Sequence, residues 1–538
     1  MWGSNITRDQ LLQKISLLAM LGRIGDGPRR HNLMAQTDIR RSLTVEQEAE
    51  IVDNLAFLSY RRKDSQNVTA ICMEENEDGE GMLVRLAVNG GALSQIACGV
   101  REICMILEQI AQRSKVSQPE IYLYATNGPA DNPEGSEVET FFREIVKLDF
   151  SRISSRLRLA KKYRFNASQI VKLHEALRDE LPSGIEPSEM VTLRQELDSL
   201  LDLYRTLKGS PISQRDPTAR EDVGQIIMIV HELNRSPGLH TALNQSTRLD
   251  ELERDAMKDW LAKVGQYYGA SRKLVLAARR PKCKLFQRIR VETFQFEVPN
   301  EVRLPSRPGS ALALMQSLRK LDVSNLHTFK GSESEAENTL LKRLDGTRSG
   351  IKVHAEIKLL FYYETHPQKT RPRVICANKS ACYLCDLFFR VHGQFQVLTT
   401  FGKLKERWIL PDWLDTIPED RLPALRTIIE RLDNVLDMEI IRVLRSRSHE
   451  RRRDPIESAI CLSAHWSSSN LGDLPTSRPL HREHSVDSIG AGSGGVLHSS
   501  AVLRSAGVSH CIILRAVYTC LHTLLHRRLQ FLDHMPPL

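Results

Sequence analysis

The sequence lacks the features of a membrane-spanning or disulfide-stabilised protein. It has no run of about 18 or more apolar residues, and the most apolar late segment, residues 507–532, is interrupted by His and Arg. Its 10 cysteines are scattered over 538 residues, which excludes a dense disulfide framework. The N-terminal stretch has no long apolar region followed by a small-residue cleavage site, so it predicts an amphipathic helix rather than a signal peptide. We therefore expect no membrane span and a cytoplasmic or nuclear location.

Positive charge is in small excess, and lysine is missing from the C-terminal part of the chain. The chain has 75 Lys and Arg against 66 Asp and Glu, a formal net charge of +9. Residues 445–538 hold 11 Arg, no Lys and 7 acids, which is +4, so +5 remains for residues 1–444. That larger part is only mildly basic, which is weak support for nucleic-acid binding. Residues 445–538 are rich in Arg, Ser, Gly and His and predict a disordered tail.

Helical periodicity dominates residues 1–270. Apolar side chains recur three and four residues apart, most clearly at Leu193, Leu197, Leu200, Leu201, Tyr204 and Leu207. Pro and Gly mark breaks between helices at residues 182–184, 209–211 and 236–238. The acidic stretch at residues 74–81 separates two apolar runs and predicts a solvated loop. These patterns indicate a largely α-helical N-terminal region, to which the sequence assigns no chemistry.

From residue 286 onward, helix and strand alternate. Residues 286–298 alternate polar and apolar side chains, which predicts a strand. Asn378 or Ser380 can cap a following helix, and Gly393 can take the left-handed turn that ends it. The periodicity predicts helices at residues 353–363, 380–391 and 423–444. It predicts strands at residues 373–376 and 394–398. Such alternation favours a small α/β domain with a mixed sheet flanked by helices.

Two short motifs place metal-binding side chains at the starts of the first two of these helices. His354 and Glu356 are separated by one residue, and Cys382 and Cys385 lie three residues apart on one helix face. One His and two Cys ligands leave the fourth position of a tetrahedral Zn²⁺ open, as catalytic zinc sites require. The pattern therefore predicts a zinc site at His354, Cys382 and Cys385. It predicts Glu356 as a carboxylate that moves protons without binding the metal.

The same motifs also allow two closed, purely structural zinc sites. Cys376 lies close enough in sequence to become a fourth ligand. Alternatively, His392 and His366 can complete a four-ligand site with the cysteine pair, which leaves Glu356 as an ordinary acid at a helix N-terminus. A closed site of either kind holds a domain together but activates no water.

Two further sets of side chains have both a functional and a structural interpretation. The aromatic residues Tyr383, Trp408 and Trp413 can stack on a flipped base or fill the core. The densest basic cluster before the tail can follow a phosphate backbone or form a solvated face, and it consists of Arg279, Arg280, Lys282, Lys284, Arg288 and Arg290.

Residues 353–411 resemble the zinc-binding core of the cytidine-deaminase-like superfamily, whose pattern is His-x-Glu followed by Pro-Cys-x-x-Cys. They are also similar to a deaminase-like family found mainly in fungi and related to bacterial toxin-type deaminases. Besides the two motifs, the second similarity rests on His392, Gly393, Gly402, Lys403, Trp408 and Pro411. Two residues depart from the expected pattern. Ala381 stands where the superfamily usually has proline, and Phe401 stands where a polar residue such as histidine is expected.

The resemblance implies a small three-layer α/β fold, Zn²⁺ held by His354, Cys382 and Cys385, and Glu356 as the proton shuttle. It implies an enzyme that hydrolytically deaminates a nucleobase in a nucleotide or nucleic acid. From the pairing of the two motifs we expect cytosine in preference to adenine. RNA and single-stranded DNA are then candidate partners, whereas no membrane and no particular protein partner is indicated. We expect a helical region at residues 1–270, a deaminase-like domain at 271–444 with its core at 350–411, and a tail at 445–538.

One expected element is not visible in the sequence. A hairpin should precede the His-x-Glu helix, but residues 330–350 are polar and show no strand pattern, so the strand pair would have to draw on residues 286–298. A degraded sheet would favour an alternative function. In that alternative, the domain is catalytically inactive, its zinc is structural, and the chain acts as an interaction protein.

Overall fold

A computed structural model of the chain describes most of residues 1–445. The described residues are 1–21, 27–34, 41–59, 66–116, 133–160, 163, 168–178, 184–209, 216–280, 283–303, 333–348, 350–366 and 371–445. The predicted tail, apart from Arg445, lies outside them. Among the described helices, none combines the length and the apolar character that crossing a membrane requires.

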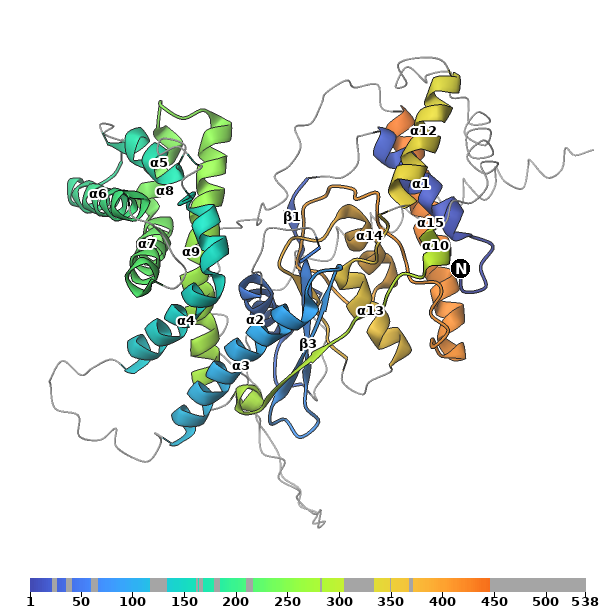
Figure 1. Ribbon diagram of the computed structural model, residues 1–538, viewed down its shortest axis with the longest axis horizontal. Helices are drawn as coiled ribbons and strands as arrows, with labels where there is room; N and C mark the ends of the chain where they lie inside the picture. Colours follow the sequence, from blue (N-terminus) through green and yellow to red (C-terminus); the bar gives the residue numbers. More distant parts are fainter. Residues whose placement is uncertain are drawn as a thin grey trace, which may run out of the picture. The chain divides into compact units, whose positions relative to one another are not determined.

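The fold is organised around a four-stranded mixed sheet (Figure 1). Its strands are β2 (Thr69–Glu75), β3 (Met82–Val88), β4 (Ile289–Thr293) and β5 (Cys376–Ala377), in the spatial order β4-β3-β2-β5. Strand β2 pairs antiparallel with β3 and with β5, and β3 pairs parallel with β4. A separate pairing joins β1 (Arg29–Arg30) antiparallel to β6 (Thr399–Thr400).

The two central strands are buried on both faces, because their side chains alternate between two hydrophobic cores. Ile71 and Met73 of β2 belong to the first core, and Ala70 and Cys72 belong to the second. Every residue of β2 and β3 is buried. A strand that is covered on both faces has a continuous run of apolar residues in its sequence, rather than alternating polar and apolar residues.

The β2–β3 hairpin corrects two expectations. Its strands lie within the residues expected to be helical, and it is the strand pair that the sequence pattern does not show ahead of the His-x-Glu helix. The acidic stretch is a turn only in part, because Glu74 and Glu75 are buried in β2. Gly79 makes the turn with a φ of +70°, which glycine adopts without strain.

Helices cover both faces of the sheet, which confirms the predicted three-layer α/β architecture (Figure 1). Helices α2 (Val45–Leu58) and α3 (Leu93–Val116) pack on the face that contributes to the first core. Helix α13 (Ala355–Thr365) packs on the opposite face. Helix α14 (Tyr383–His392) lies beside α13, where the rings of Phe361 and Phe388 stack with centroids 6.0 Å apart.

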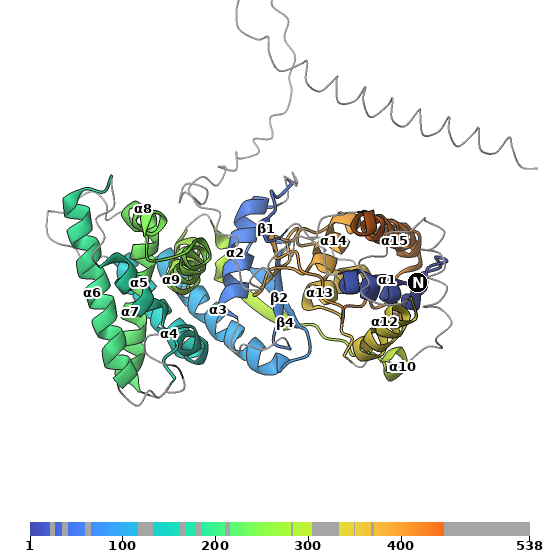
Figure 2. The ribbon, with the colours of Figure 1, turned by 90° about the horizontal axis from the view of Figure 1, so that it is seen from above.

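A further helical layer packs against α14. Helix α15 (Leu422–Arg445) contacts α14, and α1 (Arg8–Leu21) contacts both α15 and α12 (Glu333–Arg348), as Figure 2 shows. Lys14 of α1 is fixed to α15 by an ion pair with Asp433 at 2.6 Å. Both the N-terminal helix and the helix expected at residues 423–444 are therefore present. The short elements are α10 (Asn300–Arg303), η3 (Lys284–Gln287) and η5 (Glu419–Arg421).

Six of the described helices lie in sequence between β3 and β4 after α3. Their bounds are α4 (Pro133–Arg156), α5 (Gln169–Leu177), α6 (Pro187–Gly209), α7 (Pro217–Arg235), α8 (Pro237–Gln245) and α9 (Glu251–Arg279). Helix α9 contacts α4 and α7, and it also packs on α2 and α3. The leucine stripe predicted from the sequence is buried in α6, and Ser236 both ends α7 and caps α8, as the Pro-Gly break indicates.

The predicted strands are longer than the observed ones. Strand β4 covers only the middle of residues 286–298, and β5 overlaps only the end of residues 373–376. Residues 394–398 form no ladder, and they contribute a single parallel bridge between Val374 and Gln396.

Candidate metal centre

The two motifs meet at the N-termini of α13 and α14. His354 is the residue immediately before α13, in an extended conformation with φ −69° and ψ 152°. Cys382 has the same position before α14, and its Sγ accepts a hydrogen bond from the Cys385 N–H at 3.4 Å. The capping residue of α14 is therefore Cys382 rather than the predicted Asn378 or Ser380. Gly393 ends α14 with a φ of +76°, as predicted.

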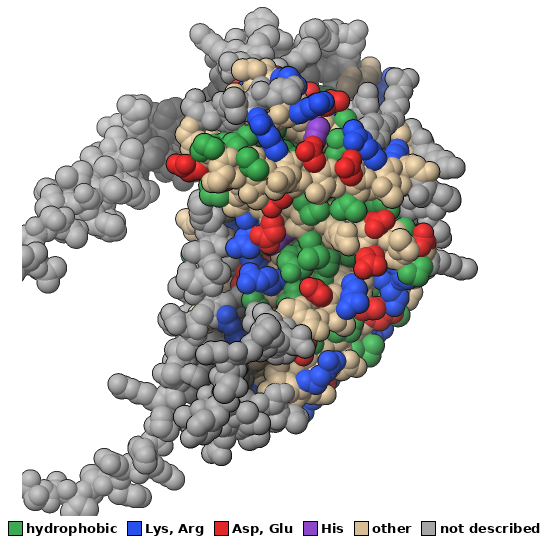
Figure 3. Space-filling view, turned by 90° about the vertical axis from the view of Figure 1, so that its left-hand side faces the viewer, with side chains coloured by type: hydrophobic (Ala, Val, Ile, Leu, Met, Phe, Trp, Pro, Cys, Tyr) green, Lys and Arg blue, Asp and Glu red, His purple; other side chains and the backbone are tan. Residues whose placement is uncertain are grey.

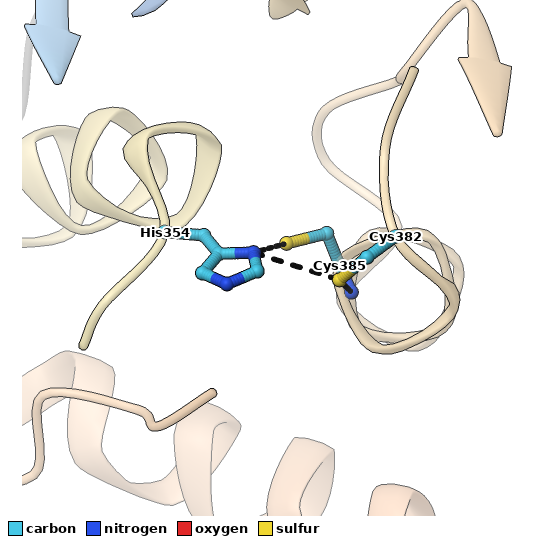
Figure 4. A group of neighbouring side chains, drawn as sticks. All are labelled: His354, Cys382 and Cys385. Carbon is cyan, nitrogen blue, oxygen red and sulfur yellow. Dashed lines mark hydrogen bonds between the residues drawn. The ribbon is translucent and has the colours of Figure 1, made fainter. Parts of the chain in front are cut away.

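Three donor atoms converge between the two helices, as Figure 4 shows. His354 Nδ1 lies 3.5 Å from Cys382 Sγ and 3.4 Å from Cys385 Sγ. All three donor atoms lie within 4.8 Å of one another, and all three residues are buried. Nitrogen and sulfur ligands of a tetrahedral Zn²⁺ are roughly 3.6 Å apart, given metal–ligand distances of about 2.0 to 2.3 Å. The donor set therefore fits a metal ion of this kind.

Glu356 lies in the first turn of α13, next to these donors but outside the group of three. Its side chain is 3% exposed, and Oε2 accepts no hydrogen bond from the described residues. Burial raises the pKa of the Glu356 carboxyl, nearby His354 lowers it, and the net direction is upward. A buried carboxyl with an unsatisfied oxygen beside an open metal position is suited to exchanging protons with a molecule bound there.

A cavity of about 610 Å³ opens onto this centre. His354, Cys382 and Glu356 line one part of it. The remaining walls come from α12, from the segment that follows β6, and from residues next to β2, β3, α13 and α14. The residues of these walls are Val68, Asn89, Arg343, Gly346, Thr347, Lys352, Lys379, Ser380, Phe401, Lys403, Leu404, Lys405, Glu406 and Arg407. Its volume lies within the range of about 300 to 1,000 Å³ that is typical of small-molecule sites.

Residues 353–412 match the family model of the OTT_1508-like deaminases. These residues form a deaminase domain of the cytidine deaminase-like superfamily. No curated protein and no solved structure matches the chain. The matched segment contains all three donors of the candidate metal centre and Glu356.

Burial and mutual contact set the protonation of the donors in the deaminase domain. Burial opposes ionisation of Cys382, but the hydrogen bond with Cys385 and the nearby His354 hold the pKa of the Cys382 thiol well below its ordinary value. Burial raises the pKa of the Cys385 thiol, and the charge of Cys382 raises it further. Burial lowers the pKa of His354, yet Cys382 outweighs it and the pKa is raised. A metal ion bound here would displace the protons that these groups share.

Two residues that the sequence analysis does not identify hold the start of α13 in place. Asn89 Oδ1 accepts the Ala355 N–H at 2.8 Å, which replaces the cap that the His354 side chain does not provide. Lys358 Nζ donates to the carbonyl oxygens of Val88 and Asn89 at 2.9 and 3.1 Å. Burial lowers the pKa of Lys358 to about 8. The only sequence signal for these contacts of Asn89 and Lys358 is the Asn-Gly-Gly sequence directly after the second apolar run.

The opposite ends of the two metal-binding helices are also joined. Glu364 of α13 is fully buried and lies 3.3 Å from His392 Nε2 of α14. Arg421 donates to both oxygens of Glu364, at 2.9 and 3.1 Å. Burial raises the pKa of Glu364, but His392 and Arg421 outweigh it and lower the pKa to about 2. This ion cluster fixes α13 relative to α14 and therefore fixes the spacing of the donors.

The residues of the two closed-site alternatives lie elsewhere. Cys376 is in β5, where its Sγ faces the Ala49 carbonyl oxygen of α2 at 4.0 Å. His392 contacts Glu364, and His366 stacks on Tyr362 with ring centroids 4.5 Å apart. Among the described residues, the group that could hold a metal ion consists of the predicted three donors without a fourth protein ligand.

The aromatic residues considered for base stacking do not line the cavity. Trp408 is fully buried against Phe388, with ring centroids 6.3 Å apart, and Tyr383 is also buried in the core. Trp413 packs edge-on against Phe296. The aromatic residue that does line the cavity is Phe401, at one of the two positions that depart from the expected pattern.

Three residues of the basic cluster around β4 are paired with acids. Arg279 pairs with Glu137 at 3.2 Å, and Lys284 pairs with Glu80 at 2.7 Å. Arg288 contacts Asp78. Lys282 lies outside the described residues. Ion pairing of this kind favours the structural interpretation of the cluster as a solvated face.

Ala381, the second departure, uses the atom that a proline would lack. Its N–H donates to the Thr399 carbonyl oxygen at 2.8 Å, and its own carbonyl oxygen accepts the Phe401 N–H at 3.1 Å. Proline has no N–H and would break the first of these bonds. In this deaminase domain, alanine therefore ties the cysteine motif to β6.

Proposed function

We propose that the chain is a zinc-dependent hydrolytic deaminase of a nucleobase, cytosine in preference to adenine, in a nucleotide or nucleic acid. The observation that carries the proposal is the convergence of His354, Cys382 and Cys385 beside Glu356 at one end of a cavity. Three donors without a fourth protein ligand are the arrangement of catalytic rather than structural zinc sites. The preference for cytosine rests on the resemblance of the two motifs to cytidine deaminases.

The residues would share the reaction as follows. Zn²⁺ bound to His354, Cys382 and Cys385 would make a water acidic enough to attack at neutral pH. Glu356 takes one proton from that water and passes it to the ring nitrogen, and it then passes the second proton of the same water to the departing amine. The water oxygen bonds to the ring carbon, the exocyclic carbon–nitrogen bond breaks, and ammonia leaves. The burial of Glu356 beside the donors and its unsatisfied Oε2 support this role, because the carboxyl must be able to hold the proton between the two steps.

Zinc content and deamination together test the proposal. Purified full-length protein is analysed for zinc and assayed on cytidine, cytidine monophosphate, single-stranded RNA and DNA, and the adenine equivalents. Glu356→Gln should retain zinc and lose activity by about 10² to 10⁴-fold, the usual contribution of general acid–base catalysis. Cys385→Ser should lose both zinc and activity. Cys376→Ser is the matched control and should keep both.

Two results would contradict the proposal. One is stoichiometric zinc with no deamination of any substrate and no effect of Glu356→Gln, which would favour a structural zinc in an interaction protein. The other is equal zinc loss in Cys376→Ser and Cys385→Ser, which would favour a closed site. The presence of the β2–β3 hairpin removes the observation that motivated the inactive alternative.

We further propose that the deaminase unit extends beyond residues 271–444 to include β2 and β3, and that helices α4 to α9 select a substrate or partner. The support is their position in the sequence, between the hairpin and the metal-binding helices. Hydrogen exchange in these helices should slow when a substrate strand or partner is added, and protection confined to the cavity would contradict this role.

The seven described cysteines are free thiols, which supports a reducing cytoplasmic or nuclear location that imaging of a tagged chain can test.

A further inference from the structure

The charged side chains that line the cavity at the candidate metal centre are mainly positive. Two of its lining residues are acids, Glu356 and Glu406. Among the described lining residues, six are basic, namely Arg343, Lys352, Lys379, Lys403, Lys405 and Arg407. The whole chain has 75 basic and 66 acidic residues, so a ratio of six to two is a local feature rather than a consequence of composition. The surface of the described helices that Figure 3 shows differs, because basic and acidic side chains are interspersed there.

Three of the cations are on the segment that follows β6, and this segment is anchored to the metal centre at both ends. Its Lys403 carbonyl oxygen accepts the N–H of Tyr383, the residue after Cys382, at 3.0 Å. Its Arg407 carbonyl oxygen accepts the Lys352 N–H at 2.9 Å, two residues before His354. The segment begins at Gly402, whose φ of +72° and close approach to the Gly27 backbone leave no room for a side chain. The backbone that carries these three cations is therefore tied to the segments that carry the donors.

Among the described residues that line the cavity, acids are fewer than cations. Glu406 is already engaged, because Arg343 of α12 donates to both of its oxygens at 2.7 and 2.8 Å. Glu356 is assigned to proton transfer at the metal. Lys352 and Lys379 precede His354 and Cys382 by two and three residues, so they add positive charge beside the donors themselves. Like charges gathered around one concave surface repel one another, and a polyvalent anion bound among them relieves that repulsion.

We infer that this cavity binds the phosphate group of a nucleotide unit, with the segment from Lys403 to Arg407 as the phosphate-binding wall. The inference rests on the proposed function, which places the base at the metal end. The apolar side chains Val68, Phe401 and Leu404 supply contact surface for a flat ring, and the cations supply charge-assisted hydrogen bonds for phosphate oxygens. Two sources share this chemistry, a free nucleotide and a single-stranded nucleic acid.

Binding to the Glu356→Gln protein tests the inference without turnover. Isothermal titration is run with cytidine, cytidine monophosphate and a short cytidine oligonucleotide, at about 50 and 200 mM salt. Cytidine monophosphate should bind about tenfold or more tightly than cytidine, and the difference should shrink at the higher salt concentration. Further tightening with the oligonucleotide identifies a strand as the source, and equal affinity identifies a free nucleotide.

Two triple variants with the same change in charge locate the site. Lys403→Gln, Lys405→Gln and Arg407→Gln together should abolish the preference for the phosphorylated ligand. Lys284→Gln, Arg288→Gln and Arg290→Gln, in the basic cluster around β4, should leave it intact. Zinc content and thermal melting report whether each variant is folded. If the first triple variant does not fold, the single variants Lys405→Gln and Arg407→Gln replace it, and each should weaken phosphate-dependent binding severalfold.

The outcomes separate this inference from the proposed function. Equal binding of cytidine and cytidine monophosphate, or equal losses in the two triple variants, would overturn phosphate recognition even if cytidine is deaminated. Phosphate-dependent binding that is lost only in the first triple variant supports the inference even if no substrate is deaminated. In that second case, the deaminase proposal fails and a nucleotide-binding site remains.

Discussion

Helices begin differently in the two parts of the molecule. In the helical region, a side chain at the first position accepts the helix's own amide, as Asp216 does for α7, Ser236 for α8 and Asp250 for α9. In the deaminase domain, His354 and Cys382 occupy those positions. The His354 side chain caps nothing and faces the other donors instead. The start of α13 thus lacks a cap of its own, which Asn89 supplies from the sheet, whereas Cys382 still caps α14 by accepting the Cys385 N–H.

Metal removal should give the largest difference between the two parts. Without a metal, three buried donors remain at the starts of α13 and α14 with no ion to hold them together. Helices α6 to α9 contain none of these donors, so metal removal should leave their structure unchanged. We expect chelation to speed hydrogen exchange at the first turns of α13 and α14 by orders of magnitude, because structural stability and metal binding are coupled. Exchange in α6 to α9 should not change. Uniform acceleration through the whole chain would contradict this division, and adding zinc back is the control.

Acid should weaken the deaminase domain through Glu364. Its pKa is about 2 in the folded chain against an ordinary value of 4.5, so the carboxylate stabilises the fold above about pH 4.5. That contribution is lost as the pH falls from 4.5 toward 2. The difference in unfolding free energy between wild type and Glu364→Gln should therefore shrink by up to about 1.4 kcal/mol per pH unit in this window. Chemical denaturation of the metal-free proteins measures it, and a difference that stays constant with pH would show that Glu364 is not the titrating group.

The sequence predicts the metal centre better than the sheet that supports it. His354, Glu356, Cys382 and Cys385 are local motifs, so their chemistry and spacing can be read directly, and the structure brings them together. The β2–β3 hairpin cannot be predicted in this way, because 266 residues separate the end of β3 from the start of α13 and because the hairpin is buried on both faces. Its strands consequently resemble buried helix segments, and only the acidic turn between two apolar runs marks them. Asn89 is not identified for the same reason, since its role depends on a contact with Ala355 that the sequence does not indicate.

A matched pair of cap removals gives the finest test of the comparison. Asn89→Ala and Asp250→Ala each remove a side chain that accepts an amide hydrogen bond at the start of a helix, at 2.8 Å in both cases. Each should cost about 1 kcal/mol of stability, the usual value of an N-cap. Only Asn89→Ala should also weaken zinc binding and deamination, because the helix that it caps carries His354 and Glu356. Denaturation curves, zinc affinity and turnover are compared for the two variants. If both lower stability equally and neither alters zinc affinity or turnover, then the cap supplied by the sheet stabilises α13 without positioning the metal centre.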